Sequence, residues 1–278
     1  MLPCCRVAAV LTLLLCPALA AAQTPPPAPT TPERSDPDVR VSPLQPEFNL
    51  AALPTTLRMP VHKWAFRVTH RFTRPLGEGD FGDLVSNFFG FDSGAQIGLE
   101  LRYGLLPGTQ VGVHRTSDRT IEIFTQHNFL NQRDGKPLGL DAIVTVEGGN
   151  NFREHYRTGV GAVISRELAK RVALYAEPLF VANTNPFETG SNGTMMLGLG
   201  GRVRIRPSTY VVAEITPRLA GYDPGVSQAS FGIEGRAGGH LFQINFSNGF
   251  GTTPGQIARG GISNNNWYIG FNIARKFF

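Results

Sequence analysis

Apolar and polar residues alternate along most of the chain beyond residue 60. In AQIGLELRY, residues 95–103, the odd positions carry apolar or aromatic side chains, and the even positions carry polar side chains or glycine. Residues 194–205 and 209–219 show a similar alternation. Successive side chains of a strand point to opposite faces, so a period of two predicts strands with one apolar and one polar face.

The alternation divides the chain into about twelve segments, most of them close to the roughly 9–11 residues that a tilted membrane-spanning strand needs. The predicted strands are 61–73, 94–105, 109–117, 119–130, 138–149, 156–167, 171–182, 194–205, 209–219, 228–236, 240–250 and 265–277. Many short strands separated by turn residues predict an all-β protein.

The composition of the polar face distinguishes a membrane barrel from a soluble sandwich, which keeps its apolar face inside and varied polar residues outside. Here the apolar face is bulky and continuous, whereas the other face holds Gly, Arg, Glu, Gln and Asn. An apolar outer wall around a polar interior is typical of a barrel in lipid. Because lipid satisfies no backbone polar group, the sheet must close on itself. We therefore predict a single transmembrane antiparallel β-barrel over residues 61–278.

Short and long connections alternate between the predicted strands. PST is one of the short ones, the longest are at 74–93 and 251–265, and only TSDR breaks the alternation. Outer-membrane barrels have short periplasmic turns and longer extracellular loops, so we expect periplasmic termini and extracellular long loops. Aromatic residues should then mark both rims. Those expected at the periplasmic rim are Trp64, Tyr103, Phe129, Tyr210 and Phe277, and those at the outer rim are Tyr156, Phe180, Phe231, Phe250 and Trp267.

The chain ends in a strand-like stretch, WYIGFNIARKFF. An even number of strands lets this last strand pair with the first. Many outer-membrane proteins end on Phe after such a strand, and the stretch resembles the signal that the barrel-insertion machinery reads. The apolar phase includes Phe277, whereas the terminal Phe278 is out of step with it.

The first 22 residues have the features of a secretory signal peptide. Arg6 precedes an apolar run, and small residues around Ala20 supply a cleavage site. The run is shorter than the roughly 20 residues that a membrane-spanning helix needs. Residues 23–60 are rich in Pro, Thr and charge, which predicts a disordered periplasmic linker. Within this linker, Phe48 to Leu57 is the part expected to dock loosely on the barrel.

Charge and cysteine usage restrict the partners. All three cysteines, Cys4, Cys5 and Cys16, lie in the predicted signal peptide, so the exported chain has no thiol. The histidines show no metal-ligand spacing, and we expect no cofactor. Without residues 1–22, which hold one Arg and no acidic residue, the net charge falls from +5 to +4. This excess favours anionic partners without specifying one. The expected partners are outer-membrane lipid, the insertion machinery and small polar solutes, but no nucleic acid.

Four phrases of the sequence carry a resemblance to a known family. They are THRF (69–72), FFGFDSGAQIGLELRYGL (88–105), VGVHRTSDRT (111–120) and NFLNQ (128–132). Together they resemble an uncharacterised family of bacterial outer-membrane β-barrel proteins, catalogued as a domain of unknown function. The resemblance covers roughly residues 55–278 and implies the fold and the outer membrane of a Gram-negative-type envelope. It transfers no substrate and no site residue.

Thirteen charged residues fall on the polar phase of the predicted strands and are the candidate lumen lining. They are Arg67, Arg71, Glu100, Arg102, Glu122, Asp141, Glu147, Arg202, Arg204, Glu214, Arg218, Glu234 and Arg236. Twelve tilted strands about 4.8 Å apart give a backbone radius of roughly 12 Å, and an Arg side chain reaches about half of that distance. Two interpretations remain open: a charged lining that selects solutes, or packed Arg–carboxylate pairs that fill the barrel.

Two further features are candidates for function. In the first long loop, DFGDLVSNFFG has helical spacing with Asp80 as N-cap and Gly90 as stop, and this helix either enters the mouth or packs on a rim. In VHRTSDR, His114 lies near Thr116 and Ser117, which raises a lipid hydrolase as an alternative. Such short matches recur by chance, and His114 is on the lumen phase, so catalysis is not the favoured interpretation. We expect a narrow porin-like channel for small polar or anionic solutes; the alternatives are a structural or interaction barrel with a closed lumen, and the hydrolase.

Overall fold

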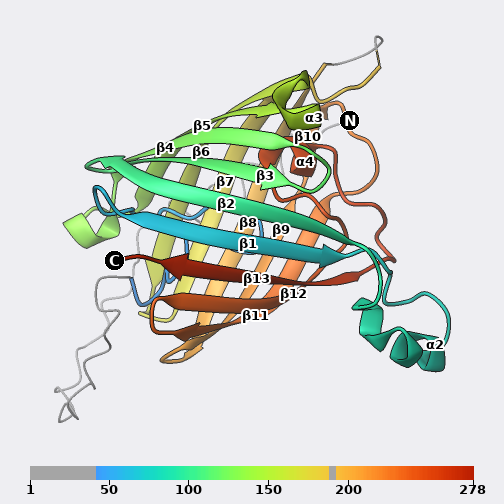
Figure 1. Ribbon diagram of the computed structural model, residues 1–278. Coiled ribbons are helices and arrows are strands. Elements are labelled where there is room, and N and C mark those ends of the chain that lie inside the picture. The colour runs from blue at the N-terminus through green and yellow to red at the C-terminus, as the bar shows by residue number, and fades with distance from the viewer. Residues whose placement is uncertain (1–41, 188–191) are drawn as a thin grey trace, which may run out of the picture. The chain divides into compact units, whose positions relative to one another are not determined.

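The computed structural model describes residues 42–187 and 192–278 (Figure 1). The predicted signal peptide and residues 23–41 of the predicted linker lie outside the described residues. No helix among the described residues is long and apolar enough to cross a membrane.

Antiparallel strands form one closed sheet (Figure 1). The strands are β1 (Trp64–Phe72), β2 (Ala95–Leu106), β3 (Thr109–Thr116), β4 (Ile121–Leu130), β5 (Gly139–Gly148), β6 (Glu154–Leu168), β7 (Val172–Ala182), β8 (Gly193–Arg206), β9 (Thr209–Thr216), β10 (Arg218–Gly221), β11 (Gln228–Ala237), β12 (His240–Ser247) and β13 (Tyr268–Lys276). β9 and β10 are two halves of one barrel strand, interrupted at Pro217, and both pair with β8. The predicted twelve-stranded barrel is confirmed, with strand ends that agree to within three residues.

Pairing of the last strand with the first closes the barrel. β13 runs antiparallel to β1, from the pair Ala65↔Lys276 to the pair Arg71↔Gly270. The Phe277 N–H donates to the Trp64 carbonyl (2.9 Å), which continues the ladder beyond β13. The strand-like end of the sequence is therefore ordered because the first strand pairs with it.

The two faces of the wall have the predicted polarity. Ile123 and Ile233 are more than half exposed on the outer face, whereas their neighbours Glu122 and Glu234 are buried on the inner face. Within the described residues this apolar outer face has no covering partner, and such a face is stable against lipid. The alternation along each strand therefore separates a lipid-facing wall from a lumen.

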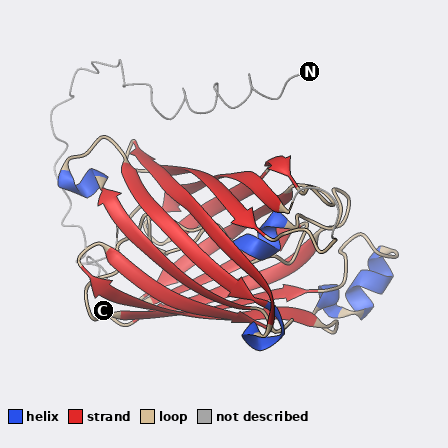
Figure 2. Cartoon of the chain, turned by 90° about the horizontal axis from the view of Figure 1, so that it is seen from above, coloured by secondary structure: helices blue, strands red, loops and turns tan. Residues whose placement is uncertain are grey.

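The long and short connections lie at opposite ends of the barrel. The short-turn end carries the turns β2–β3, β4–β5, β6–β7, β8–β9 and β11–β12. The long-loop end carries the other connections. The helical elements occupy these ends (Figure 2) and are α2 (Phe81–Ser86), η1 (Phe88–Gly90), η2 (Gln132–Asp134), α3 (Gly149–Phe152) and α4 (Pro254–Ala258).

The first long loop forms the predicted helix but leaves the lumen free. The Asp80 and Asp83 side chains form a capping box at the N-terminus of α2, with hydrogen bonds of 2.9 and 3.0 Å. No residue of α2 is buried, and Phe81 is 73% exposed. In Figure 1 the helix projects beyond the end of the barrel. The sequence left two positions open for this helix, inside the mouth of the barrel or on its rim. The position inside the mouth is wrong.

The N-terminal segment requires a correction. The predicted linker reaches residue 60, but residues 42–59, here called the luminal segment, lie inside the barrel. Every residue from 44 to 57 is buried. The segment is built mainly of apolar and small polar residues, so the enclosed lumen offers contacts that a solvated linker lacks. The disordered linker is therefore wrong for this part of the chain.

The predicted aromatic belts hold at some positions. Trp64, Phe129 and Phe277 are about half exposed at the short-turn end, and the Trp64 ring lies 4.4 Å from that of Tyr103. Tyr210 differs, because it is fully buried on the inner face and its hydroxyl donates to the Pro43 carbonyl (2.9 Å). It lies on the lumen phase of β9 and contacts the luminal segment.

Candidate functional site

The luminal segment bends back on itself in a tight turn at residues 50–53. The Leu50 N–H donates to the Leu53 carbonyl (2.7 Å), and the Thr55 N–H donates to the Phe48 carbonyl (2.7 Å). The Asn49 side-chain amide donates to the Ala52 carbonyl (3.2 Å). These bonds leave the N–H groups of residues 51–53 and the Ala51 carbonyl free to bind the barrel wall.

The N–H groups of the turn bind one carboxylate. Ala51, Ala52 and Leu53 each donate a backbone hydrogen bond to Glu214 of β9, at 3.0–3.1 Å. Successive N–H groups of a turn form a concave site with partial positive charge, which suits an anion. Hydrogen bonds to a charged acceptor are stronger than neutral ones. Glu214 therefore holds the turn to one side of the lumen.

The carbonyl of the same turn binds a different part of the wall, three to four strands away from β9. The Ala51 carbonyl accepts from Asn272 Nδ2 of β13 (2.9 Å), from Arg71 Nη2 of β1 (3.3 Å) and from Arg67 Nη1 (3.5 Å). A single peptide turn thus connects β9 with β1 and β13 across the lumen.

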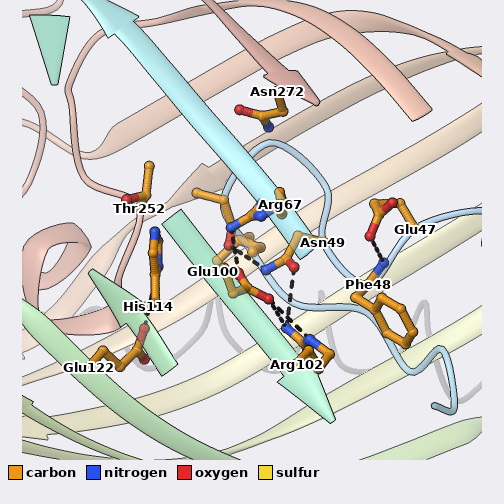
Figure 3. A network of polar contacts seen from close by, with 12 residues as sticks. Glu47, Phe48, Asn49, Arg67, Glu100, Arg102, His114, Glu122, Thr252 and Asn272 are labelled. Carbon is orange, nitrogen blue, oxygen red and sulfur yellow. Dashed lines mark hydrogen bonds and ion pairs between the residues drawn. The ribbon is translucent and has the colours of Figure 1, made fainter. Parts of the chain in front are cut away.

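A charged cluster on β1 and β2 lies beside the turn (Figure 3). Glu100 forms ion pairs with Arg67 (3.0 Å) and Arg102 (2.8 Å). Arg102 also donates to Asn49 Oδ1 (3.3 Å), and its guanidinium lies 5.0 Å from the centre of the Phe48 ring. All three charged side chains are buried. The cluster is therefore both a set of ion pairs and a contact surface for the luminal segment.

A second ion pair holds the segment from strands β8 and β11, on either side of β9. Arg202 of β8 pairs with Glu234 of β11 at 2.7 Å and donates to the Asn49 carbonyl (2.8 Å). Gln243 of β12 donates to the Leu50 carbonyl (3.2 Å) and to Glu234 (2.8 Å). Buried charges are costly unless they are paired and hydrogen-bonded, and here the segment supplies part of that pairing.

Further contacts fix the segment near the short-turn end. Lys276 pairs with Glu47 at 2.7 Å, and both side chains are buried. The Thr56 and Ser165 hydroxyls lie 2.5 Å apart. These contacts join the segment to the wall on both sides of the turn at residues 50–53.

An apolar cluster in the lumen was not anticipated from the sequence. It joins four groups of buried residues: Leu44, Leu50, Ala52 and Leu53 of the luminal segment, Ile143, Val163, Ala173 and Tyr175 of β5–β7, Leu179, Val181, Met196 and Val212 of β7–β9, and Ile257 and Ala258 of α4. Gly200 makes room for it, because a Cβ there would lie 2.3 Å from Leu50 Cδ1. One side of the lumen is therefore a packed apolar core and not a polar surface.

The last long loop, which carries α4, enters the barrel at the long-loop end. α4 contacts β6, β7 and β8, across the lumen from the strands that its loop connects. Thr253 donates to Glu147 (2.5 Å), and Gln256 donates to Thr116 Oγ1 (3.0 Å) and Asp118 Oδ2 (3.1 Å). Burial raises the pKa of the Asp118 carboxyl, but hydrogen bonds from Thr116 and Thr120 outweigh it, so the pKa lies below its ordinary value.

The structure places most of the predicted lining residues in the lumen. Ten are buried on the inner face: Arg67, Arg71, Glu100, Arg102, Glu122, Asp141, Glu147, Arg202, Glu214 and Glu234. Arg204 and Arg236 lie partly exposed at the short-turn end. Arg218 lies at the long-loop end, where it pairs with Asp223. The predicted list missed Arg157, Glu177 and Lys276, which the same alternation places on the inner face.

The hydrolase alternative finds no activated nucleophile. His114 is buried, and its Nδ1 faces Glu122 Oε2 at 3.7 Å. Its Nε2 has no hydrogen-bond partner among the described residues. Activation of a Ser or Thr needs a hydroxyl within hydrogen-bond distance of the base. In the part of the chain that the structure describes, His114 has no such partner.

Solved structures with a similar fold are outer-membrane barrels. A crystal structure of an outer-membrane channel from Pseudomonas putida F1 aligns over 79% of this chain and 97% of that chain, with a TM-score of 0.52 and 12% identity. The NanC porin aligns over 78% of this chain and 100% of that chain, with a TM-score of 0.52 and 7% identity. At these identities the likeness establishes the fold alone.

Comparison with protein families identifies the family of the chain as well as its fold. No curated protein matches the chain. Residues 47–277 match the family described as "Membrane bound beta barrel domain (DUF5777)", and this range includes most of the luminal segment. This description and the shared fold support an outer-membrane location. The chain belongs to this family of membrane-bound β-barrels.

Proposed function

We propose that the protein is a narrow porin-like channel of the outer membrane for small polar or anionic solutes, closed by its luminal segment. One observation carries the proposal: the segment fills the lumen without being part of the wall. Among the described residues, none between 42 and 59 pairs with a barrel strand; the isolated bridge Asn49↔Pro54 lies within the segment. The segment can therefore leave without breaking a ladder hydrogen bond.

The lumen without the segment supports a polar pathway. The groups that would become free include Arg71, Lys276 and Glu214, which now bind the segment. The pairs Arg67–Glu100 and Arg202–Glu234 lie within the wall and would remain. Rings of charged and polar side chains of this kind select solutes in pores. The termini are proposed to be periplasmic, so the segment would enter from the periplasmic side.

A disulfide tests the role of the segment in the full-length chain. The hydroxyls of Thr56 and Ser165 are in contact, so Thr56→Cys with Ser165→Cys, here called the segment-locked variant, should form a disulfide between the segment and β6. The control pair is Thr184→Cys with Thr194→Cys, whose hydroxyls lie 2.8 Å apart and join the loop after β7 to β8, away from the luminal segment. In planar bilayers, we expect the oxidised segment-locked variant to be silent and to conduct after reduction. The control pair should conduct in both states.

A deletion provides the decisive comparison. Removal of residues 42–59 should give a stable open conductance in bilayers. A flat trace from this deletion variant, with the barrel shown to be folded, would rule out the channel. Conductance that is the same in the oxidised and reduced forms of the segment-locked variant would instead show that the segment does not control the pathway.

The second candidate is a closed structural or interaction barrel. The apolar cluster shared by the luminal segment, α4 and the wall favours it, because such packing is typical of a permanent core. In this case, deletion of residues 42–59 leaves Glu214 and Lys276 without their partners and destabilises the barrel. A silent bilayer together with a large loss of thermal stability would select this function.

A further inference from the structure

A polar hollow of about 400 Å³ lies at the long-loop end, beside the contacts of α4 described above. It is formed by the β3–β4 turn, the loop with α3, the start of β6 and the end of α4. Its charged and titratable lining residues are Asp118, Arg119, Glu154, His155, Arg157 and Arg259. A second hollow of about 310 Å³ shares Asp118 and Arg259 with it. Arg259 therefore lies between two open spaces.

Two arginines in this hollow have unused donors. Arg157 uses Nη1 to pair with Glu147 (3.0 Å), but its buried Nε has no hydrogen-bond partner among the described residues. The Arg259 guanidinium forms no hydrogen bond or ion pair within residues 42–187 and 192–278. Arg259 is exposed to solvent, yet the protein atoms around it displace part of its hydration, and this desolvation together with the neighbouring Arg157 guanidinium lowers the pKa of Arg259. Two positive charges that repel each other are stabilised by an anion between them.

Three carboxylates lie in or beside the hollow, and each has another partner. The exposed Glu154 faces His155 Nε2 at 3.9 Å. Glu147 accepts from Arg157 and from Thr253. Asp118 accepts from Thr116, the Thr120 N–H and Gln256. None of these carboxylates forms an ion pair with Arg259 within the described residues, although the charges of Glu147 and Asp118 partly offset that of Arg259. Positive charge and unused N–H donors thus meet in one solvent-accessible space.

The backbone around the hollow is strained. Arg119, Asn150 and His155 all have positive φ values, of 66°, 47° and 53°. The Asn151 N–H donates to the Arg119 carbonyl (2.7 Å), which joins the loop before β6 to the β3–β4 turn. Non-glycine residues in this region of φ are uncommon and cluster at ligand sites.

We infer that this hollow binds an oxyanion, the carboxylate or phosphate group of a small solute, between Arg157 and Arg259. Guanidinium groups present two parallel N–H donors that match the oxygens of either group. The hollow is large enough for a small molecule, since ligand pockets begin at roughly 300 Å³. A role as the first binding station for a transported solute rests on the proposed channel, whereas binding itself does not.

Calorimetric titration of the full-length protein in a non-ionic detergent at low salt tests the site. The probes are inorganic phosphate, glucuronate and, as the neutral counterpart, glucose. We expect phosphate or glucuronate to bind and glucose to give no heat. Arg259→Gln should weaken oxyanion binding about tenfold or more, because it removes a charge-assisted hydrogen bond. The control is Arg206→Gln, the same change at the exposed short-turn end.

Arg157→Lys provides a second variant that keeps the charge next to Glu147. Lys has no planar donor pair, so it should also weaken binding. Stronger binding of glucuronate than of phosphate identifies a carboxylate solute, and the reverse identifies a phosphate. Equal affinity in the unmodified protein and Arg259→Gln, or no binding of either anion, would overturn the inference. The two proposals can fail separately. If the variant lacking residues 42–59 does not conduct in bilayers while the full-length protein binds oxyanions, the proposed channel is wrong and the inferred binding site stands.

Discussion

Leu99 and Glu100 are neighbours in β2, yet one side chain faces lipid and the other forms ion pairs with two arginines in the lumen. At this scale the sequence is informative, because the pleat of a strand alone decides which side a residue takes. The same rule placed Arg67, Arg102 and Glu214 correctly on the inner face. It could not show that the Ala51 turn would bind them, because that contact depends on residues far away in the chain.

Leu99→Arg should reduce the free energy of unfolding in lipid by about 2–4 kcal/mol, since it moves a charge into the hydrocarbon layer. Gln96→Arg is the matched change on the inner phase of the same strand and should be mild. Both are measured by urea unfolding of the protein folded in lipid vesicles. Equal losses for the two variants would contradict the assignment of the faces.

At the scale of elements, the strands could be predicted and the two segments inside the barrel could not. Each strand has a local period of two, and α2 has a local N-cap at Asp80, so a short window of sequence contains the signal. The luminal segment has no period, and its Pro-rich composition resembles a linker. Only the enclosed lumen supplies its partners. For the same reason, the sequence predicted a helix in the loop with α2 but none in the loop with α4. It is the loop with α4 that enters the barrel.

Gly200→Val should loosen the luminal segment, because a Cβ at this position would lie 2.3 Å from Leu50 Cδ1. We expect faster proteolysis of the segment and more frequent channel opening in bilayers. Gly201→Val is the matched control, since its Cβ would lie 3.4 Å from Leu174 Cδ2, away from the segment. If the two valine variants open equally often, contact with Leu50 does not hold the segment in place.

At the scale of the whole molecule, closure of the sheet and burial of its charges make the barrel a single cooperative unit. The wall has no free edge, and the ion pairs of the lumen are shielded from water. Disruption of one strand pair would expose both the edge and the charges.

The folded protein should therefore stay compact in SDS at room temperature and migrate faster on gels before boiling than after it. In detergent it should give a β-type circular dichroism spectrum. The control is the same sample unfolded in urea before loading, which should migrate as the boiled form does. A mature chain that is soluble and monomeric without detergent would contradict the membrane barrel, because more than half of Ile123 and Ile233 would then face water.

The carbonyl of Ala51 has consequences for the order of folding. It is bound by Arg71 from the first strand and by Asn272 from the last, and Asn272 lies 221 residues away in the chain. This binding site does not exist until β13 has paired with β1. The luminal segment is synthesised before every strand, yet it can reach its final position only after the last strand is in place. Contacts between such distant residues form slowly, so we expect the luminal segment to reach its final position late in folding, no earlier than closure of the barrel.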